Sequence, residues 1–280
     1  MTPVQDCKYS HDVAVASITS YYTFLERINS DDVFKFEYPP PTGWPQFKRE
    51  LFPQCPDAVV ELLRHIPYPT ITGSGLDLMD ATTVIEYDHH VNTCLHYYPD
   101  QKAQSDVLRP QGYAPDFELP PHVVQLTDGG RYGYILLVDT EQGTIIVTKN
   151  DNEYPTGIYG GTSYLGYHPE ERADGDDDEI YDCRPLCWKR APAIPIKEFF
   201  EMCKEQFRNM NWFATVDENG CSEVYQLRKD QHWETTWERG MKKILTDCGW
   251  PCDGEGGGWD RVRAEKECKE MELEISRYDE

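Results

Sequence analysis

The sequence has no long apolar run, no secretory signal and no familiar nucleophile motif. No stretch approaches the roughly 20 apolar residues of a membrane-spanning helix, and residues 1–6 lack a basic region followed by an apolar run. The Gly-x-Ser-x-Gly turn of serine hydrolases and the signatures of cysteine proteases are also missing. We therefore expect a cytoplasmic protein, with the nucleus as the alternative, and no membrane partner.

Basic residues are scarce relative to acidic ones. The chain of 280 residues carries 27 lysines and arginines against 50 aspartates and glutamates, which gives a formal net charge of −23. Such a charge repels phosphate backbones and removes the attraction that dominates nucleic-acid affinity. It excludes nucleic acid as the favoured partner, whereas solubility or a basic protein partner is compatible with it.

The ten cysteines do not form a strong metal motif. Without a signal segment, free thiols are favoured over disulfides. Two pairs, Cys183 with Cys187 and Cys248 with Cys252, are each separated by three residues, and together they offer a weak alternative as a four-cysteine zinc site. The sequence thus predicts no metal and no cofactor.

Hydrophobic periodicity predicts an α+β protein. Helical spacing of apolar residues marks several segments: 12–29, 56–66, 194–213, 229–250 and a final helix capped by Asp260. The predicted buried stripe of 56–66 consists of Val59, Leu62, Leu63 and Ile66, and that of 194–213 of Ile196, Phe199, Phe200, Cys203, Phe207 and Met210. The proline-rich stretch 38–47 is predicted to be an extended connector that Trp44 can dock onto the body. Strands are predicted where β-branched and aromatic residues gather: 82–87, 93–98, 122–127, 133–139 and 144–148. We predict a mainly antiparallel sheet flanked by helices in an α+β body over residues 1–212. A helical C-terminal extension follows over residues 213–280.

The glycines at 129, 130 and 133 precede a strand, so they do not fit a phosphate-binding loop. Such a loop needs a strand, then glycines, then a helix whose amides face the anion. Residues 139–143 have the composition of a turn, and Gly143 can adopt the positive φ that this turn requires. The segment 133–148 is therefore predicted to be a β-hairpin.

Histidines and aromatic residues offer one candidate for a small-molecule site. His90 and His96 would share a face of an extended segment while His89 points away, so surface or half-buried histidines are the favoured interpretation of this group. As an alternative, His90 or His96 could act as an acid–base group. The aromatic lining of such a pocket would come from four residues: Tyr87, Tyr97, Trp188 and Trp212.

The order of elements resembles the SMI1/KNR4 (SUKH) superfamily over about residues 45–212. The resemblance rests on a short helix "AVVELLRHIPY", the hairpin "HVVQLTDGGRYGYILLVDTEQGTIIV" and the helix "IPIKEFFEMCKEQF". Residues that match the family pattern are Gly133, Asp139, Gly143 and Ile145 in the strand pair, and Glu198, Phe199 and Phe200 in the helix. The stretches "YPPPTGWP" and "ELLRHIPY" also look like those of uncharacterised filamentous-fungal proteins.

The resemblance implies a protein-binding fold whose members include signalling scaffolds and toxin-neutralising proteins, with no catalytic residues. Our first hypothesis is therefore a non-enzymatic interaction module with an acidic surface. The alternative is a small-molecule or metal-dependent enzyme that uses the aromatic-lined pocket. A third possibility is self-association through the last helix, whose apolar seam consists of Ala264, Cys268, Met271 and Ile275. The sequence leaves the oligomeric state open.

Overall fold

The computed structural model describes the helices and strands of part of the chain. The described residues are 8–28, 35–70, 76–97, 119–129, 133–149, 191, 193–216, 222–226, 235–251 and 258–276. The helices are α1 (His11–Ile28), the short 3₁₀ helix η2 (Arg49–Leu51), α2 (Asp57–His65), α3 (Tyr87–Tyr97), α6 (Ile196–Arg208), α7 (Thr236–Asp247) and α8 (Arg261–Ser276). The strands are β1 (Phe36–Glu37), β2 (Tyr68–Pro69), β3 (Asp77–Met79), β4 (Thr82–Val84), β5 (Val123–Gln125), β6 (Thr127–Asp128), β7 (Tyr134–Asp139), β8 (Thr144–Lys149), β9 (Ala193–Pro195), β10 (Trp212–Val216) and β11 (Ser222–Gln226).

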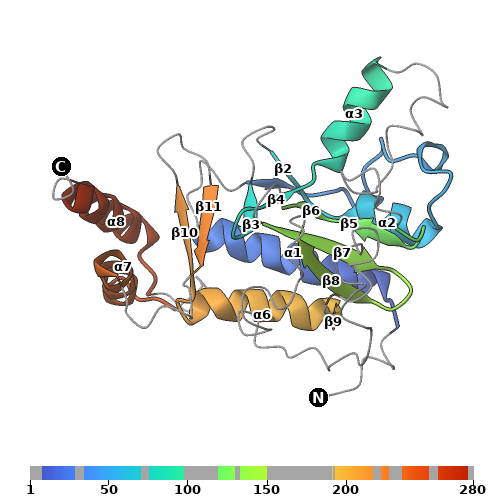
Figure 1. Cartoon of the computed structure of the whole chain (residues 1–280). Coiled ribbons are helices and arrows are strands. Elements are labelled where there is room, and N and C mark those ends of the chain that lie inside the picture. The colour runs from blue at the N-terminus through green and yellow to red at the C-terminus, as the bar shows by residue number, and fades with distance from the viewer. Residues whose placement is uncertain are drawn as a thin grey trace, which may run out of the picture.

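The main core lies between the sheets and the helix pair α1 and α6, which run side by side (Figure 1). Each helix turns one apolar stripe inward, and the rings of Tyr21 and Phe200 meet with their centroids 5.3 Å apart. Lys204 of α6 is also buried, where its Nζ donates to Ser20 Oγ at 2.7 Å and lies 2.8 Å from Glu201 Oε1. The predicted α+β class is confirmed.

A four-stranded antiparallel sheet in the order β5-β7-β8-β9 covers this core. The turn between β7 and β8 is the predicted hairpin, in which Gly143 has a φ of +68°. Asp139 Oδ1 accepts hydrogen bonds from the backbone N–H groups of Glu141 at 2.8 Å and Gln142 at 2.9 Å, and so fixes the turn. The hairpin prediction is confirmed.

Two buried threonines join this sheet to the three-stranded sheet β3-β4-β6. Thr127 Oγ1 donates to Tyr134 O at 3.0 Å and accepts from Leu136 N at 2.9 Å, while Tyr134 N donates to Thr82 Oγ1 at 2.9 Å. Side-chain hydroxyls thus replace ladder bonds where the strands separate. A Cβ on Gly133 would lie only 1.6 Å from Ala81 O, so the backbones can meet here because this residue has no side chain.

Helix α2 and the connector before it follow the sequence prediction. Pro56 occupies the position before the first residue of α2 without a side-chain capping bond, and the predicted stripe of Val59, Leu62, Leu63 and Ile66 is buried. Trp44 docks the proline-rich connector, because its Nε1 donates to Ile66 O at 2.9 Å. The connector is therefore held on the body by a hydrogen bond from a mainly apolar side chain.

The segment 93–98 was predicted as a strand, and this prediction is wrong. Residues up to Tyr97 belong to helix α3, which begins at Tyr87 with Asp88 in its first turn. Among the side chains of this helix whose burial the structure describes, Tyr87 and Val91, four residues apart, are buried. Helical spacing of these two residues decided the conformation, although Thr93, Tyr97 and their neighbours favour strands when considered locally.

The C-terminal part begins with a hairpin that the sequence did not predict. Strands β10 and β11 pair from Trp212 with Gln226 to Val216 with Ser222. Helix α7 follows, and its N-cap residue Thr235 forms a reciprocal capping box with Glu238. Helix α8 packs along α7, and the seam residue Ala264 is buried within the chain.

Candidate functional site

The inner end of α3 brings together several of the residues singled out in the sequence. Tyr87 is buried and donates from its hydroxyl to Gln125 O at 2.7 Å, which ties α3 to the edge of β5. The rings of Tyr87 and His90 meet edge to face with centroids 6.4 Å apart. Asp88 lies between them in the sequence, in the first turn of the helix.

Burial favours the uncharged forms of two groups at this inner end. It raises the pKa of Asp88 above its ordinary value, and Oδ1 of this carboxyl is buried without a hydrogen-bond partner. It lowers the pKa of His90, and the nearby His89 adds to this effect. His90 is therefore neutral at pH 7 and could accept a proton, which is the property of a general base.

The other proposed pocket residues do not join this group. Tyr97 is 70% exposed at the outer end of α3, where its ring meets His96 edge to face at 4.7 Å. His90 and His96 are six residues apart, so on a helix they lie on different faces and not on the shared face of a strand.

Trp212 is buried in the core against Phe207, with ring centroids 5.5 Å apart. Trp188 lies outside the described residues. Of the four aromatic residues proposed to line a pocket, the structure places Tyr87, Tyr97 and Trp212 in three different environments: a sheet edge, an exposed helix end and the core. These three do not form a common lining.

The cysteine alternative cannot be followed as a set, because Cys183, Cys187 and Cys252 lie outside the described residues. Cys248 is buried at the end of α7, and burial is the main cause that raises the pKa of its thiol. Among the residues that the structure does describe, no group of three or more histidines, cysteines or acids is arranged to hold a metal ion.

A histidine between two carboxylates was missed in the sequence. His122 Nδ1 lies 3.3 Å from Glu141 Oε1, and its Nε2 lies 4.0 Å from Asp139 Oδ1. Pairing of Val123 with Asp139 brings β5 to the end of β7, and Thr140 N donates to His122 O at 2.9 Å. The strand register was the signal that could have located this group. Since Asp139 Oδ1 already accepts two turn amides, the arrangement braces the turn.

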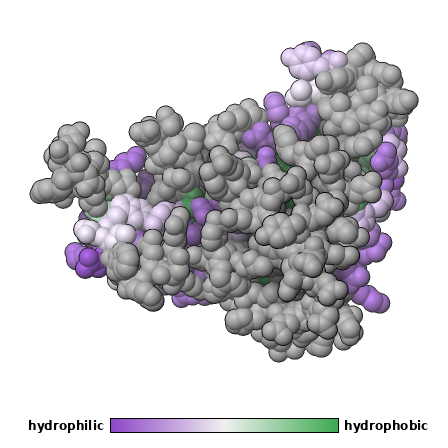
Figure 2. Space-filling model, in the orientation of Figure 1, coloured by the Kyte–Doolittle hydropathy of each residue, from purple (hydrophilic) through white to green (hydrophobic). Residues whose placement is uncertain are grey.

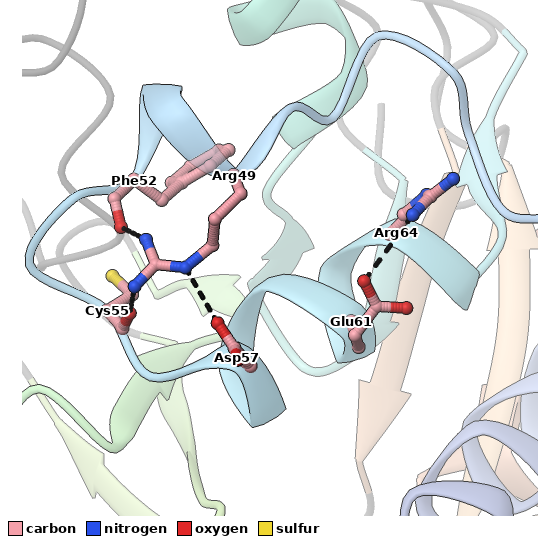
Figure 3. A network of polar contacts seen from close by, with 6 residues as sticks. All are labelled: Arg49, Phe52, Cys55, Asp57, Glu61 and Arg64. Carbon is pink, nitrogen blue, oxygen red and sulfur yellow. Dashed lines mark hydrogen bonds and ion pairs between the residues drawn. The ribbon is translucent and has the colours of Figure 1, made fainter.

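The polar contacts around α2 likewise brace a turn (Figure 3). Arg49 donates from Nε to Asp57 Oδ1 at 2.8 Å and from its terminal nitrogens to the carbonyls of Cys55, at 2.6 Å, and Phe52. This guanidinium thus spans the turn that leads into α2. Arg64 Nη1 lies 3.4 Å from Glu61 Oε1 on the helix itself.

Comparisons with known proteins give no information on the candidate site. No protein-family model, curated protein or solved structure matched the chain. None of the helices in the described part of the chain is both long and apolar enough to cross a membrane. The SUKH resemblance stays a prediction.

Proposed function

We propose that the chain is a non-enzymatic protein-binding module of the cytosol or nucleus, a SUKH-like scaffold or neutralising protein. The observation that carries this proposal is the outer end of α3, which stands away from the body (Figure 1). Leu95 is 37% exposed and Tyr97 70% exposed, with His96 also at the surface. Aromatic side chains held on a helix are effective anchors in protein interfaces.

The charge of the chain supports a basic partner. A net charge of −23 speeds association with a positively charged surface. Exposed carboxylates occur on several elements, including Asp57 at the start of α2 and Glu141 in the hairpin turn. Among the coloured residues in Figure 2, hydrophilic side chains predominate at the surface, and hydrophobic ones show only in small areas.

Three buried thiols support a reducing compartment. Cys55, Cys203 and Cys248 form no disulfide. Burial raises the pKa of Cys55 and Cys203, which keeps these thiols protonated. Protonated, buried thiols are poor nucleophiles, so these two side chains support a structural role.

A quantitative affinity purification from the native source tests the proposal. We compare the wild-type chain with the variant Leu95→Ser/Tyr97→Ala, and with Val262→Ser, which changes an exposed apolar residue on α8. The proposal expects a specific protein whose recovery falls at least about tenfold with the α3 variant, because hot-spot residues contribute about 2 kcal/mol or more. Equal recovery with all three chains would reject α3 as the binding surface.

The alternative enzyme is favoured by one specific feature, the half-buried His90 near the start of α3, whose pKa is lowered mainly by burial. Under that alternative, His90→Ala removes any turnover of a small-molecule substrate, because the proton acceptor is lost. Under the proposed function, His90→Ala leaves partner binding within about twofold of wild type, since His90 lies at the inner end of α3 and away from the exposed contact residues. Loss of partner binding with folded His90→Ala would contradict the proposed surface.

A further inference from the structure

The described contacts between α3 and the body gather at the inner end of the helix. Ile85, just before the helix, donates from its backbone N–H to Leu126 O at 3.0 Å. Tyr87 donates from its hydroxyl to the preceding carbonyl, Gln125 O, at 2.7 Å, and Val91 one turn later is buried. The outer end of the helix stands away from the body (Figure 1). Helix α3 is therefore held by a short anchor.

His90 belongs to the face of α3 that forms this anchor. It lies three residues after Tyr87 and one before Val91, so the three side chains share one side of the helix. The ring of His90 is half-buried and meets the ring of Tyr87 edge to face, with centroids 6.4 Å apart. His89 and His96 are exposed instead. Of the histidines in α3, His90 is thus the one that docking takes partly out of water.

The ionisable groups around His90 do little to stabilise a proton on it. Along its own segment, the carboxylate of Glu86 favours a charged imidazole, whereas His89 opposes it. The ionisable side chains that face this turn from other described elements are Cys55, ahead of α2, and Tyr68 of β2. Both are uncharged, because burial raises the pKa of each. Docking of α3 and protonation of His90 therefore oppose each other, since burial lowers the pKa of this imidazole.

We propose that protonation of His90 releases α3 from the edge of β5, with the bond from Ile85 to Leu126 left as a hinge. Above the ordinary histidine pKa of 6.5, His90 is neutral whether the helix is docked or released. As the pH falls from 6.5 through the lowered pKa, the released helix takes up the proton more readily, so the docked state loses stability. Asp88 has the opposite sign. Because burial raises its pKa, its protonation favours docking and partly offsets the effect of His90.

The release itself is independent of the proposed protein-binding function, whereas its consequence rests on that function. If the outer end of α3 binds a partner, acid moves Leu95 and Tyr97 relative to the body and weakens the binding. The release is measured on the free chain. Its failure would leave the proposed function standing, and a failed affinity purification would leave the release standing.

Hydrogen exchange of the full chain at about pH 7.5 and about pH 5.5 tests the release. Each exchange rate is divided by the intrinsic rate at the same pH, and residues 196–208 of α6 serve as the internal reference. We expect protection over residues 87–97, relative to α6, to fall about threefold or more at the lower pH, as one linked proton allows. An unchanged ratio, or an equal loss of protection in α6, would overturn the proposal.

Three variants assign the effect to His90. His90→Gln stays neutral at both pH values and should keep its relative protection within about 1.5-fold. Asp88→Asn removes the offsetting carboxyl, so its loss of protection should be at least as large as that of wild type, and it stays informative if His90→Gln does not dock. His96→Gln, at the exposed end of α3, is the control and should respond as wild type does. An acid response that persists in folded His90→Gln, or is missing from Asp88→Asn, would overturn the proposal.

Discussion

Buried aromatic residues hold both α6 and α3 on the body, but the buried stripe is much longer in α6 than in α3. In α6 the buried stripe continues from Ile196 through Phe200 to Phe207, nearly the whole helix. In α3 the buried side chains that the structure describes are Tyr87 and Val91, while Leu95 and Tyr97 of the outer half lie at the surface. A helix with a full stripe stabilises the fold, whereas one anchored at a single end presents a surface.

Packing explains the difference between the two helices. Helix α6 is covered by α1 on one side and by the strands on another, so almost every apolar residue on its inner face finds a neighbour. Helix α3 meets the body through its first turns, where Tyr87 reaches β5. Mutations in the two helices should therefore differ in their effect on stability, and the following predictions test this contrast.

The largest effect is expected for Phe200→Ala in α6. Phe200 is fully buried and packs against Tyr21 and Phe199. Loss of a buried phenylalanine leaves a cavity and lowers the free energy of unfolding by about 3–5 kcal/mol. Denaturant unfolding followed by circular dichroism measures this loss. A decrease in the free energy of unfolding of less than about 1 kcal/mol would show that the α1–α6 contact contributes little to the stability of the core.

A smaller and more local loss is expected for Val91→Ala in α3. Val91 is the buried residue one turn beyond Tyr87, and the substitution removes two buried carbons at a loss of about 2 kcal/mol. Hydrogen exchange should show faster exchange over residues 87–97 than over α6. Equal acceleration in both helices would mean that α3 and α6 unfold together, and the contrast between them would fail.

Asp88→Asn is expected to stabilise the protein above acidic pH. Burial raises the pKa of Asp88 above its ordinary value of 3.8, so the folded state holds this proton more tightly than the unfolded state. Stability therefore falls as the pH rises from 3.8 through the raised pKa, and the penalty is complete above it. At pH 7 the melting temperature of Asp88→Asn should be higher than that of wild type. This increase should be smaller than the decrease caused by Val91→Ala.

The pH dependence itself checks the cause. The gain from Asp88→Asn should shrink to nothing well below pH 3.8, where the wild-type carboxyl is protonated in both states. The exposed Glu37→Gln serves as the control and should show no comparable gain at pH 7. A gain from Asp88→Asn that stays constant with pH would rule out burial of the charge as its source.

The smallest effect is expected for Tyr97→Ala at the outer end of α3. Its side chain is largely exposed and contacts His96, so the free energy of unfolding should change by less than about 0.5 kcal/mol. The same denaturant titration measures it. A loss above about 1 kcal/mol would show that the outer end is packed and would weaken its assignment as a binding surface.

Local sequence patterns predicted the elements whose signals agree with their surroundings. The stripe of α2 from Val59 to Ile66 and the hairpin around Gly143 were both predicted, since periodicity and turn chemistry act over a few residues. The prediction failed at 93–98, where strand-favouring residues lie beyond the helical anchor formed by Tyr87 and Val91. There the contact with the body outweighed local preference.

The candidate sites depended on contacts between distant segments. His122 meets Asp139 and Glu141 only because β5 pairs with β7, and Tyr87 is held by Gln125 O at the edge of the same strand. His90 and His96 were grouped in the sequence by an assumed strand, and the helix separates them. Proximity in sequence was therefore a poor guide to proximity in space.

The sequence by itself determined the α+β class, the acidic character and the buried stripes of α2 and α6, because composition and periodicity are properties of the chain alone. Only the tertiary structure decided that α3 is a helix anchored at one end. It also decided that His90 lies half-buried in the anchor of that helix. Burial and strand register arise from packing between distant segments, and no local pattern in the sequence specifies them.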